Sequence, residues 1–117
     1  MTDDDTATTR FADMLSAMGT EPRLRIVRLL LSAHPDGLVV GDIAAALQIT
    51  GSTLSHHLDK LRQKSLVKVQ RDGTRLWYSA DTDSLRDLLG FLFAECCTRT
   101  PVIAAQAIVC QTPTPRR

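Results

Sequence analysis

A short helix, a tight turn and a second helix are predicted between residues 42 and 63, and this pattern constrains the fold more than any other feature. Asp42 can cap a short Ala-rich helix from Ile43 to Leu47. The segment Ile49-Thr50-Gly51 then provides a tight turn. From Ser52 onward the next helix has one apolar face, formed by Leu54, Leu58 and Leu61, and a polar face opposite to it. This order of elements is typical of a helix-turn-helix motif.

A β-hairpin is predicted directly after this motif. Residues 66–70 alternate between apolar and polar side chains, and Leu76-Trp77-Tyr78 is rich in residues that favour strands. The connection between them, residues 71–75, contains Asp72-Gly73, the strongest short-range signal for a hairpin turn. A hairpin in this position is a wing.

Further helices are predicted on both sides of the motif and its wing. Four apolar residues with helical spacing mark a first helix that Gly19 closes: Phe11, Met14, Leu15 and Met18. Thr20-Glu21-Pro22 begins a second helix, and Asp81 or Asp83 caps a last, leucine-rich one. The predicted fold class is therefore mainly α with a β-hairpin wing, a winged helix-turn-helix in the order α-α-α-α-β-β-α.

A single winged helix-turn-helix domain is expected over residues 10–98, because 117 residues with 44% hydrophobic content suffice for one core. The acidic residues 1–9 are expected to be disordered, and residues 99–117 to form a partly flexible C-terminal extension. No segment has the apolar length of a signal peptide or membrane span, which predicts a cytoplasmic protein without a membrane partner. In that reducing compartment the three cysteines indicate thiol chemistry or burial, not a disulfide scaffold.

Positive charge is concentrated in the middle of the chain, although the net charge of the whole chain is only +1. Residues 1–48 have a net charge of −3 and residues 49–80 a net charge of +4. A basic segment suits contact with the phosphates of double-stranded DNA, although a solvated charged face would give the same pattern. The candidate DNA-binding residues are polar or basic positions of the fourth helix and the wing: Thr50, Ser52, Thr53, Ser55, His56, His57, Lys60, Lys64, Arg71 and Arg75.

Residues 19–98 resemble the ArsR/SmtB family of bacterial metal-responsive repressors. The matching pieces are Gly19-Thr20-Glu21-Pro22-Arg23-Leu24-Arg25-Ile26, Ser55-His56-His57-Leu58-Asp59-Lys60-Leu61-Arg62, Leu66-Val67, and Arg71-Asp72-Gly73 leading to Trp77-Tyr78. The resemblance implies a homodimer joined through the first and last helices, which binds operator DNA until an inducer releases it. It is also the reason to keep His57 among the DNA-binding candidates, since its place beside Leu54 and Leu61 favours a half-buried packing role. Family members often have Gln and Pro where this chain has Gly51 and Ser52.

Members of this family place their inducer sites at different positions, and two of those sites are missing here. The Cys-x-Cys pair of arsenic and cadmium sensors would fall at Val39 and Gly41. The last helix also contains none of the histidines that zinc sensors use there. What remains is Cys96-Cys97, which looks like the vicinal thiol pair of members that sense arsenic through their C-terminal region. The resemblance therefore implies trivalent arsenic, as arsenite or methylarsenite, as the inducer.

The chemistry of the residues supports this site without deciding it. Two thiols offer soft sulfur ligands to a thiophilic centre. Because adjacent helical residues point about 100° apart, both sulfurs of Cys96 and Cys97 reach one atom only if the helix frays there. The alternative is that one cysteine packs in a dimer core and the other has no role. Cys110 either completes a three-sulfur site, with residues 98–109 folding back, or is a passive thiol.

Three other functions compete with arsenic-responsive repression. A redox- or persulfide-sensing repressor would use Cys97 and Cys110. A winged-helix protein-interaction module would not contact DNA, and the +4 segment argues against it. An enzyme is disfavoured because the only histidines, at positions 34, 56 and 57, do not come together with a nucleophile and an orienting group, so neither catalytic residues nor a catalytic cofactor are expected.

Overall fold

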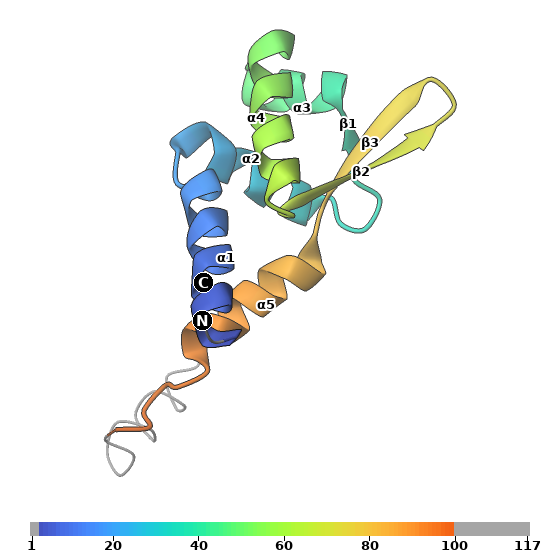
Figure 1. The fold of residues 1–117 in the computed structure, drawn as a ribbon. Coiled ribbons are helices and arrows are strands. Elements are labelled where there is room, and N and C mark those ends of the chain that lie inside the picture. Colours follow the sequence, from blue (N-terminus) through green and yellow to red (C-terminus); the bar gives the residue numbers. More distant parts are fainter. Residues whose placement is uncertain (1–2, 100–117) are drawn as a thin grey trace, which may run out of the picture. The chain divides into compact units, whose positions relative to one another are not determined.

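The structure is a computed structural model that describes residues 3–99. The chain divides into two units, residues 1–86 and residues 87–117, each of which is described by itself. The first unit contains α1 (Asp3–Met18), α2 (Glu21–Ser32), β1 (Leu38–Val39), α3 (Val40–Leu47), α4 (Gly51–Gln63), β2 (Val67–Asp72) and β3 (Arg75–Ala80). The last helix, α5 (Thr82–Phe93), crosses the boundary between the units (Figure 1).

Aliphatic side chains form the core of the first unit. The three leucines predicted to line one face of α4, Leu54, Leu58 and Leu61, are at most 1% exposed. From α2, Ile26 and Leu30 are fully buried, and α2 contacts α1, α3 and α4. Burial of each such side chain stabilises the fold by about 1.5–3 kcal/mol. This packing holds α4 by its apolar face and leaves its polar face to solvent.

The wing is a three-stranded antiparallel sheet in the order β1-β3-β2. The pairing of β2 with β3 runs from Val67 opposite Ala80 to Asp72 opposite Arg75, and the hairpin extends away from the helices (Figure 1). Its two-residue turn is therefore Gly73-Thr74, with a φ of 66° at Gly73, one residue later than the predicted Asp72-Gly73. Cross-strand pairing continues to the turn, so Arg71 and Arg75 belong to strands and not to a loop.

The sequence did not predict β1. Its two residues pair with β3, Leu38 opposite Tyr78 and Val39 opposite Trp77. A strand this short shows no alternation of apolar and polar residues, and it forms because the end of the α2–α3 connection lies along the edge of β3. The observed order is therefore α-α-β-α-α-β-β-α, and the predicted winged helix-turn-helix fold is confirmed with one additional strand.

Two helices begin earlier than the sequence indicated. The expected disorder of residues 1–9 is wrong for residues 3–9, because α1 begins at Asp3. Asp5 lies in the first turn of α1, at the positive end of the helix dipole, where a negative charge is favourable. Helix α3 begins at Val40 and not at Ile43, so Asp42 lies in its first turn and does not cap it.

Two predicted helix caps are confirmed. The Thr20 hydroxyl accepts a hydrogen bond from the Arg23 backbone N–H at 3.4 Å, at the start of α2. At the start of α5 the Asp81 carboxylate accepts one from the Ser84 N–H at 3.1 Å, which selects Asp81 over Asp83. Each side chain satisfies a backbone donor that the helix leaves unpaired.

The predicted limits of the domain, residues 10 and 98, stay predictions. Most of the expected C-terminal extension, from residue 100 onward, lies outside the described residues. Within the described part of the chain, none of the helices is both long and apolar enough to cross a membrane.

Candidate DNA-binding face and thiol pair

The start of α4 presents small polar side chains to solvent. Thr50 has an extended backbone at the N-cap, and its hydroxyl donates a hydrogen bond to the Thr53 hydroxyl at 3.0 Å. Ser52, Ser55 and His56 are also exposed. These are side chains that can donate to and accept from base edges, and none of them is taken up by the core. The predicted division of α4 into a buried and an exposed face is confirmed.

His57 lies apart from this exposed set because it packs against α2. It is half-buried, and its Nδ1 accepts a hydrogen bond from Arg23 Nε at 3.1 Å. Burial, followed by the positive charges of Arg23 and His56, lowers the pKa of His57. The imidazole is therefore neutral and joins α2 to α4, the packing and hydrogen-bonding role that its position in the sequence favoured.

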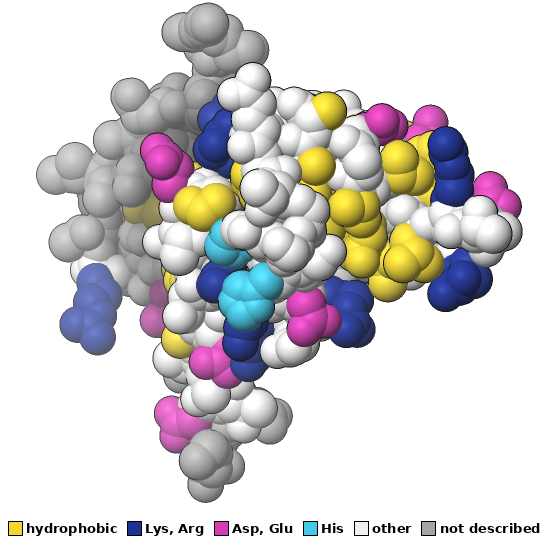
Figure 2. Space-filling view, turned by 90° about the horizontal axis from the view of Figure 1, so that it is seen from above, with side chains coloured by type: hydrophobic (Ala, Val, Ile, Leu, Met, Phe, Trp, Pro, Cys, Tyr) yellow, Lys and Arg dark blue, Asp and Glu magenta, His cyan; other side chains and the backbone are white. Residues whose placement is uncertain are grey.

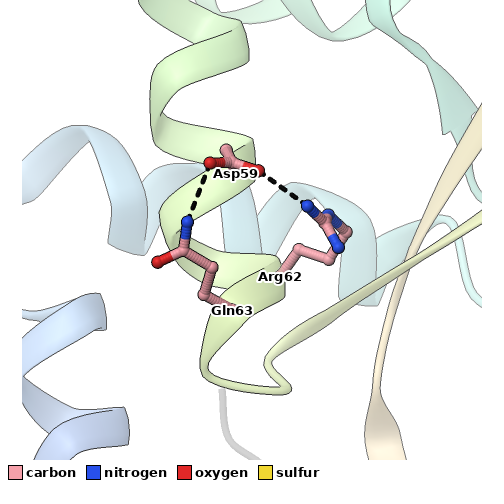
Figure 3. A network of polar contacts seen from close by, with 3 residues as sticks. All are labelled: Asp59, Arg62 and Gln63. Carbon is pink, nitrogen blue, oxygen red and sulfur yellow. Dashed lines mark hydrogen bonds and ion pairs between the residues drawn. The ribbon is translucent and has the colours of Figure 1, made fainter.

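The basic side chains near the C-terminal end of α4, including that of the C-cap residue Lys64, are in three different situations. Lys60 is exposed, whereas Lys64 Nζ lies 3.6 Å from the Asp13 carboxylate of α1. Arg62 donates to Asp59 at 2.8 Å, and Gln63 donates to the other oxygen of that carboxylate at 2.9 Å (Figure 3). The hydrogen bond from Arg62 is the main reason that the pKa of Asp59 is lowered. Figure 2 shows the two neighbouring histidines with Lys and Arg side chains beside them.

Arg71 and Arg75 are exposed near the end of the wing. Each lies within two residues of the Gly73-Thr74 turn, Arg71 in β2 and Arg75 in β3. The hairpin therefore places two long cationic side chains away from the helical core, where they can reach a phosphate backbone.

Cys96 and Cys97 lie just past the end of α5, where the helix gives way to turns. The Cys96 N–H donates to the Phe93 carbonyl at 3.0 Å, and Cys97 has a left-handed backbone with a φ of 69°. This change of backbone brings the two sulfurs to 3.2 Å. The end of the helix frays as an adjacent pair of ligands requires, and both sulfurs can contact one atom.

The hydrogen bond with Cys96, followed by burial and by the charge of Cys96, raises the pKa of the Cys97 thiol. Cys110, the third predicted ligand, lies outside the described residues. Among the described residues, no group of three or more His, Cys, Asp or Glu side chains is arranged to hold a metal ion. The described thiol site is therefore a pair of sulfurs.

One residue of this region was not among the sequence-based candidates. Arg23 Nε binds His57, and Arg23 Nη1 donates to the Ala17 carbonyl at 3.4 Å, so its guanidinium connects α1, α2 and α4. Arg23 and His57 are separated by 34 positions. No local pattern in the sequence indicates this contact.

The first unit combines packed helices, a helix α4 with an exposed polar face, and a basic hairpin. These features define a winged helix-turn-helix protein. A family model described as "Helix-turn-helix domain" matches residues 18–70. The nodulation protein NolR of Rhizobium meliloti is 37% identical over 81 residues, which cover 69% of this chain and 64% of NolR. A transcriptional repressor SmtB homologue of Synechocystis is 34% identical over 79 residues, covering 68% of this chain and 58% of that protein. The chain thus spans less than two thirds of both relatives.

The transcriptional activator HlyU of Vibrio cholerae is 30% identical over 84 residues, covering 72% of this chain and 75% of HlyU. Its solved structure superposes with a TM-score of 0.63 at 27% identity, over 78% of this chain and 96% of that one. The chain therefore belongs to the ArsR/SmtB family of winged helix-turn-helix transcriptional regulators.

Two further solved structures are similar. One, described as "Possible transcriptional regulator for arsenical resistance", has a TM-score of 0.61 at 26% identity, over 87% of this chain and 98% of that one. The other is the homodimeric winged helix-turn-helix domain Mb0332 of Mycobacterium bovis, with a TM-score of 0.63 at 24% identity, over 98% and 97% of the two chains. At that identity the second supports the fold alone.

Proposed function

We propose that this protein is a transcriptional repressor that binds double-stranded operator DNA as a homodimer and leaves it when trivalent arsenic, as arsenite or methylarsenite, binds Cys96 and Cys97. The assignment of the inducer rests on one observation, the 3.2 Å separation of the two sulfurs. The similarity to a regulator described as possibly controlling arsenical resistance supports the same assignment.

DNA recognition is assigned to α4 and the wing. The exposed start of α4, from Thr50 to His56, enters the major groove, where its hydroxyls and imidazole read base edges. Arg71 and Arg75 bind phosphates, which set affinity and register but not sequence. Repression, as opposed to activation, follows the SmtB homologue, since HlyU is described as an activator.

The thiol pair fits a small thiophilic centre. At bond lengths of roughly 2.3 Å, as in zinc–thiolate sites, one atom can contact both sulfurs. Trivalent arsenic exchanges its oxygen ligands for sulfur and releases water. Because the pKa of Cys97 is raised, its thiol is mostly protonated at neutral pH and gives up that proton on binding. Cys110 is proposed as a third sulfur for arsenite.

Release from DNA requires a change in the dimer. The two recognition helices of a dimer must match grooves about 34 Å apart, so a small change in their spacing weakens both contacts. The thiols directly follow α5, whose Leu89, Leu92 and Phe93 are exposed apolar side chains. Arsenic acts as an inducer only if it favours a dimer geometry that DNA disfavours.

Substitution of the wing arginines tests DNA binding. Arg71→Ala and Arg75→Ala each remove a phosphate contact, so affinity should fall for every DNA sequence and the salt slope should decrease by about one unit. Fluorescence anisotropy of a labelled duplex across a salt series measures both quantities. Unchanged affinity and slope in both variants would remove the wing from the interface.

Single cysteine substitutions test the inducer. Cys96→Ser and Cys97→Ser should bind DNA as the unsubstituted protein does, yet neither arsenite nor methylarsenite should release them. Cys110→Ser is the matched control: it should weaken the response to arsenite, which has three exchangeable positions, more than the response to methylarsenite, which has two. Release of Cys96→Ser and Cys97→Ser at the arsenic concentration that releases the unsubstituted protein would show that the inducer site is elsewhere.

The same sulfur separation favours a second candidate, a redox-sensing repressor. Sulfurs 3.2 Å apart are placed for oxidation to a Cys96–Cys97 disulfide, whereas the pairing of Cys97 with Cys110 considered from the sequence involves a residue outside the described ones. If peroxide or polysulfide releases the protein from DNA while arsenite leaves it bound, the redox-sensing candidate is selected.

A further inference from the structure

A basic pocket lies between α1, α2 and α4, and we call it the three-helix pocket. It has a volume of about 340 Å³, and its lining includes three cationic side chains, Arg23, Lys60 and Lys64. Among the described residues of the lining, Asp13 is the one acidic side chain, and Gln63 adds a neutral amide. The pocket therefore carries an excess of positive charge, which suits an anion.

Arg23 is held in place at this pocket by the protein itself. Its Nε donates to His57 at 3.1 Å and its Nη1 to the Ala17 carbonyl at 3.4 Å. These contacts use two of the five N–H donors of the guanidinium. Other donors of the planar group can bind an oxyanion, and the geometry of a guanidinium matches that of a phosphate.

The carboxylate within the pocket is a weak competitor for an incoming anion. Asp13 lies 3.6 Å from Lys64 Nζ, and the two side chains are 51% and 44% exposed. Ion pairs this exposed contribute at most about 1 kcal/mol. A phosphate can therefore take the place of Asp13 beside Lys64.

Arg62 is on the same helix but does not line the pocket. Its guanidinium donates to Asp59 at 2.8 Å, and the same carboxylate accepts a hydrogen bond from Gln63 (Figure 3). Arg62 thus has the charge of the pocket residues without their position, which makes it a matched control.

The pocket lies on the same side of α4 as Thr53, one of the exposed residues proposed to read DNA. Thr53, Lys60 and the C-cap residue Lys64 are separated by seven and four positions, so they share one side of the helix. At 1.5 Å per residue, Lys60 lies about 10 Å beyond Thr53, a distance close to the major-groove width of about 12 Å. When the start of α4 occupies the groove, the three-helix pocket meets the sugar–phosphate backbone at the groove's edge.

We infer that the three-helix pocket binds one phosphate of the DNA backbone, with Arg23, Lys60 and Lys64 as its cationic ligands. The inference rests on the proposed function and adds to it a site built from three helices, including α1. Arg23 anchors the phosphate because it is itself fixed to α1 and α4, and two other side chains of the lining, Lys60 of α4 and the C-cap residue Lys64, also bind the phosphate.

Salt-dependent binding of the full chain to a duplex of arbitrary sequence tests this site without knowledge of the operator. Lys60→Gln and Lys64→Gln should each lower the salt slope by about one unit, whereas Arg62→Gln should leave it unchanged. Asp13→Asn removes the competing carboxylate and should raise affinity about two- to fivefold. Circular dichroism verifies that each variant is folded.

Equal salt slopes in Lys60→Gln, Lys64→Gln and the unsubstituted protein would overturn the inference. A decrease of the salt slope in Arg62→Gln as large as that in the lysine variants would also overturn it.

Inorganic phosphate, titrated by phosphorus NMR, distinguishes the source of the anion. Phosphate binding that Lys60→Gln abolishes, with DNA slopes unchanged, would show a site for free anions and overturn the DNA assignment. A lower salt slope in the lysine variants, together with the expected decrease in Arg71→Ala, supports both the pocket and the proposed function. If the lysine variants keep the salt slope of the unsubstituted protein while Arg71→Ala lowers it, the pocket inference is overturned and the proposed function stands. If the unsubstituted protein binds no duplex, both are overturned.

Discussion

His57 is held neutral because its Nδ1 must accept the hydrogen bond from Arg23. Burial, followed by the charges of Arg23 and His56, lowers its pKa below the ordinary value of 6.5. In acid the unfolded chain therefore binds a proton more readily than the folded one. The contribution of His57 to stability is complete above about pH 6.5 and is lost as the pH falls through the lowered pKa. We expect the urea midpoint of unfolding to fall as the pH is lowered from about 7 to about 5.

His57→Gln should flatten this dependence, because an amide oxygen still accepts from Arg23 but does not titrate. His56→Gln, which changes the exposed neighbour, should retain it. The chosen range stays above the pKa of Asp59, which Arg62 lowers further, so that carboxylate remains ionised throughout. If the urea midpoint of His57→Gln falls as much as that of the unsubstituted protein, the acid sensitivity belongs to other groups.

At the level of elements, Gly37 allows the α2–α3 connection to approach the wing. Its φ is 83°, and a Cβ at this position would collide with the Tyr78 carbonyl of β3. We expect Gly37→Ala to destabilise the fold by about 2 kcal/mol or more, because it adds backbone strain to a clash with backbone atoms. Chemical denaturation measures the difference.

Gly41→Ala is the matched control for this substitution. Gly41 lies in α3, and a Cβ there meets nothing within 4 Å. Alanine should therefore leave stability unchanged or raise it by up to about 1 kcal/mol, because it favours the helix. Equal effects at both glycines would contradict the role assigned to the contact between Gly37 and β3.

At the level of the whole molecule, exposed apolar side chains on α5 predict a homodimer. Leu89, Leu92 and Phe93 are 58%, 54% and 63% exposed and share one helix face. The first helix contributes less than its sequence indicated, since Phe11 and Met14 are already buried within one chain. Light scattering should give the mass of a dimer, and Leu89→Glu should give a monomer that binds DNA weakly.

Leu24→Glu, on α2, supplies the comparison for that substitution because Leu24 is 48% exposed but lies on another helix. It should remain a dimer. A monomeric unsubstituted protein at micromolar concentration, or dissociation of Leu24→Glu as well, would argue against assembly through α5.

The candidate site was predictable only where a local signal exists. The exposed polar positions of α4 follow from the spacing of its three leucines, and the wing arginines follow from their closeness to a hairpin turn. A half-buried packing role was favoured for His57, but its partner Arg23 was not found, because 34 positions separate the two residues. Lys64 was predicted to reach DNA, and nothing near it in sequence indicates its ion pair with Asp13.

The sequence by itself determined the order of the helices, the cap at Thr20, a cap at either Asp81 or Asp83, and the hairpin, because periodicity, capping and turns act between residues a few positions apart. Only the tertiary structure decided the short strand β1, the three-helix pocket and the approach of Gly37 to β3, since each depends on how distant segments pack. The thiol pair stands between these cases: its residues are adjacent, yet their sulfurs are 3.2 Å apart because the backbone leaves the helix and becomes left-handed at Cys97.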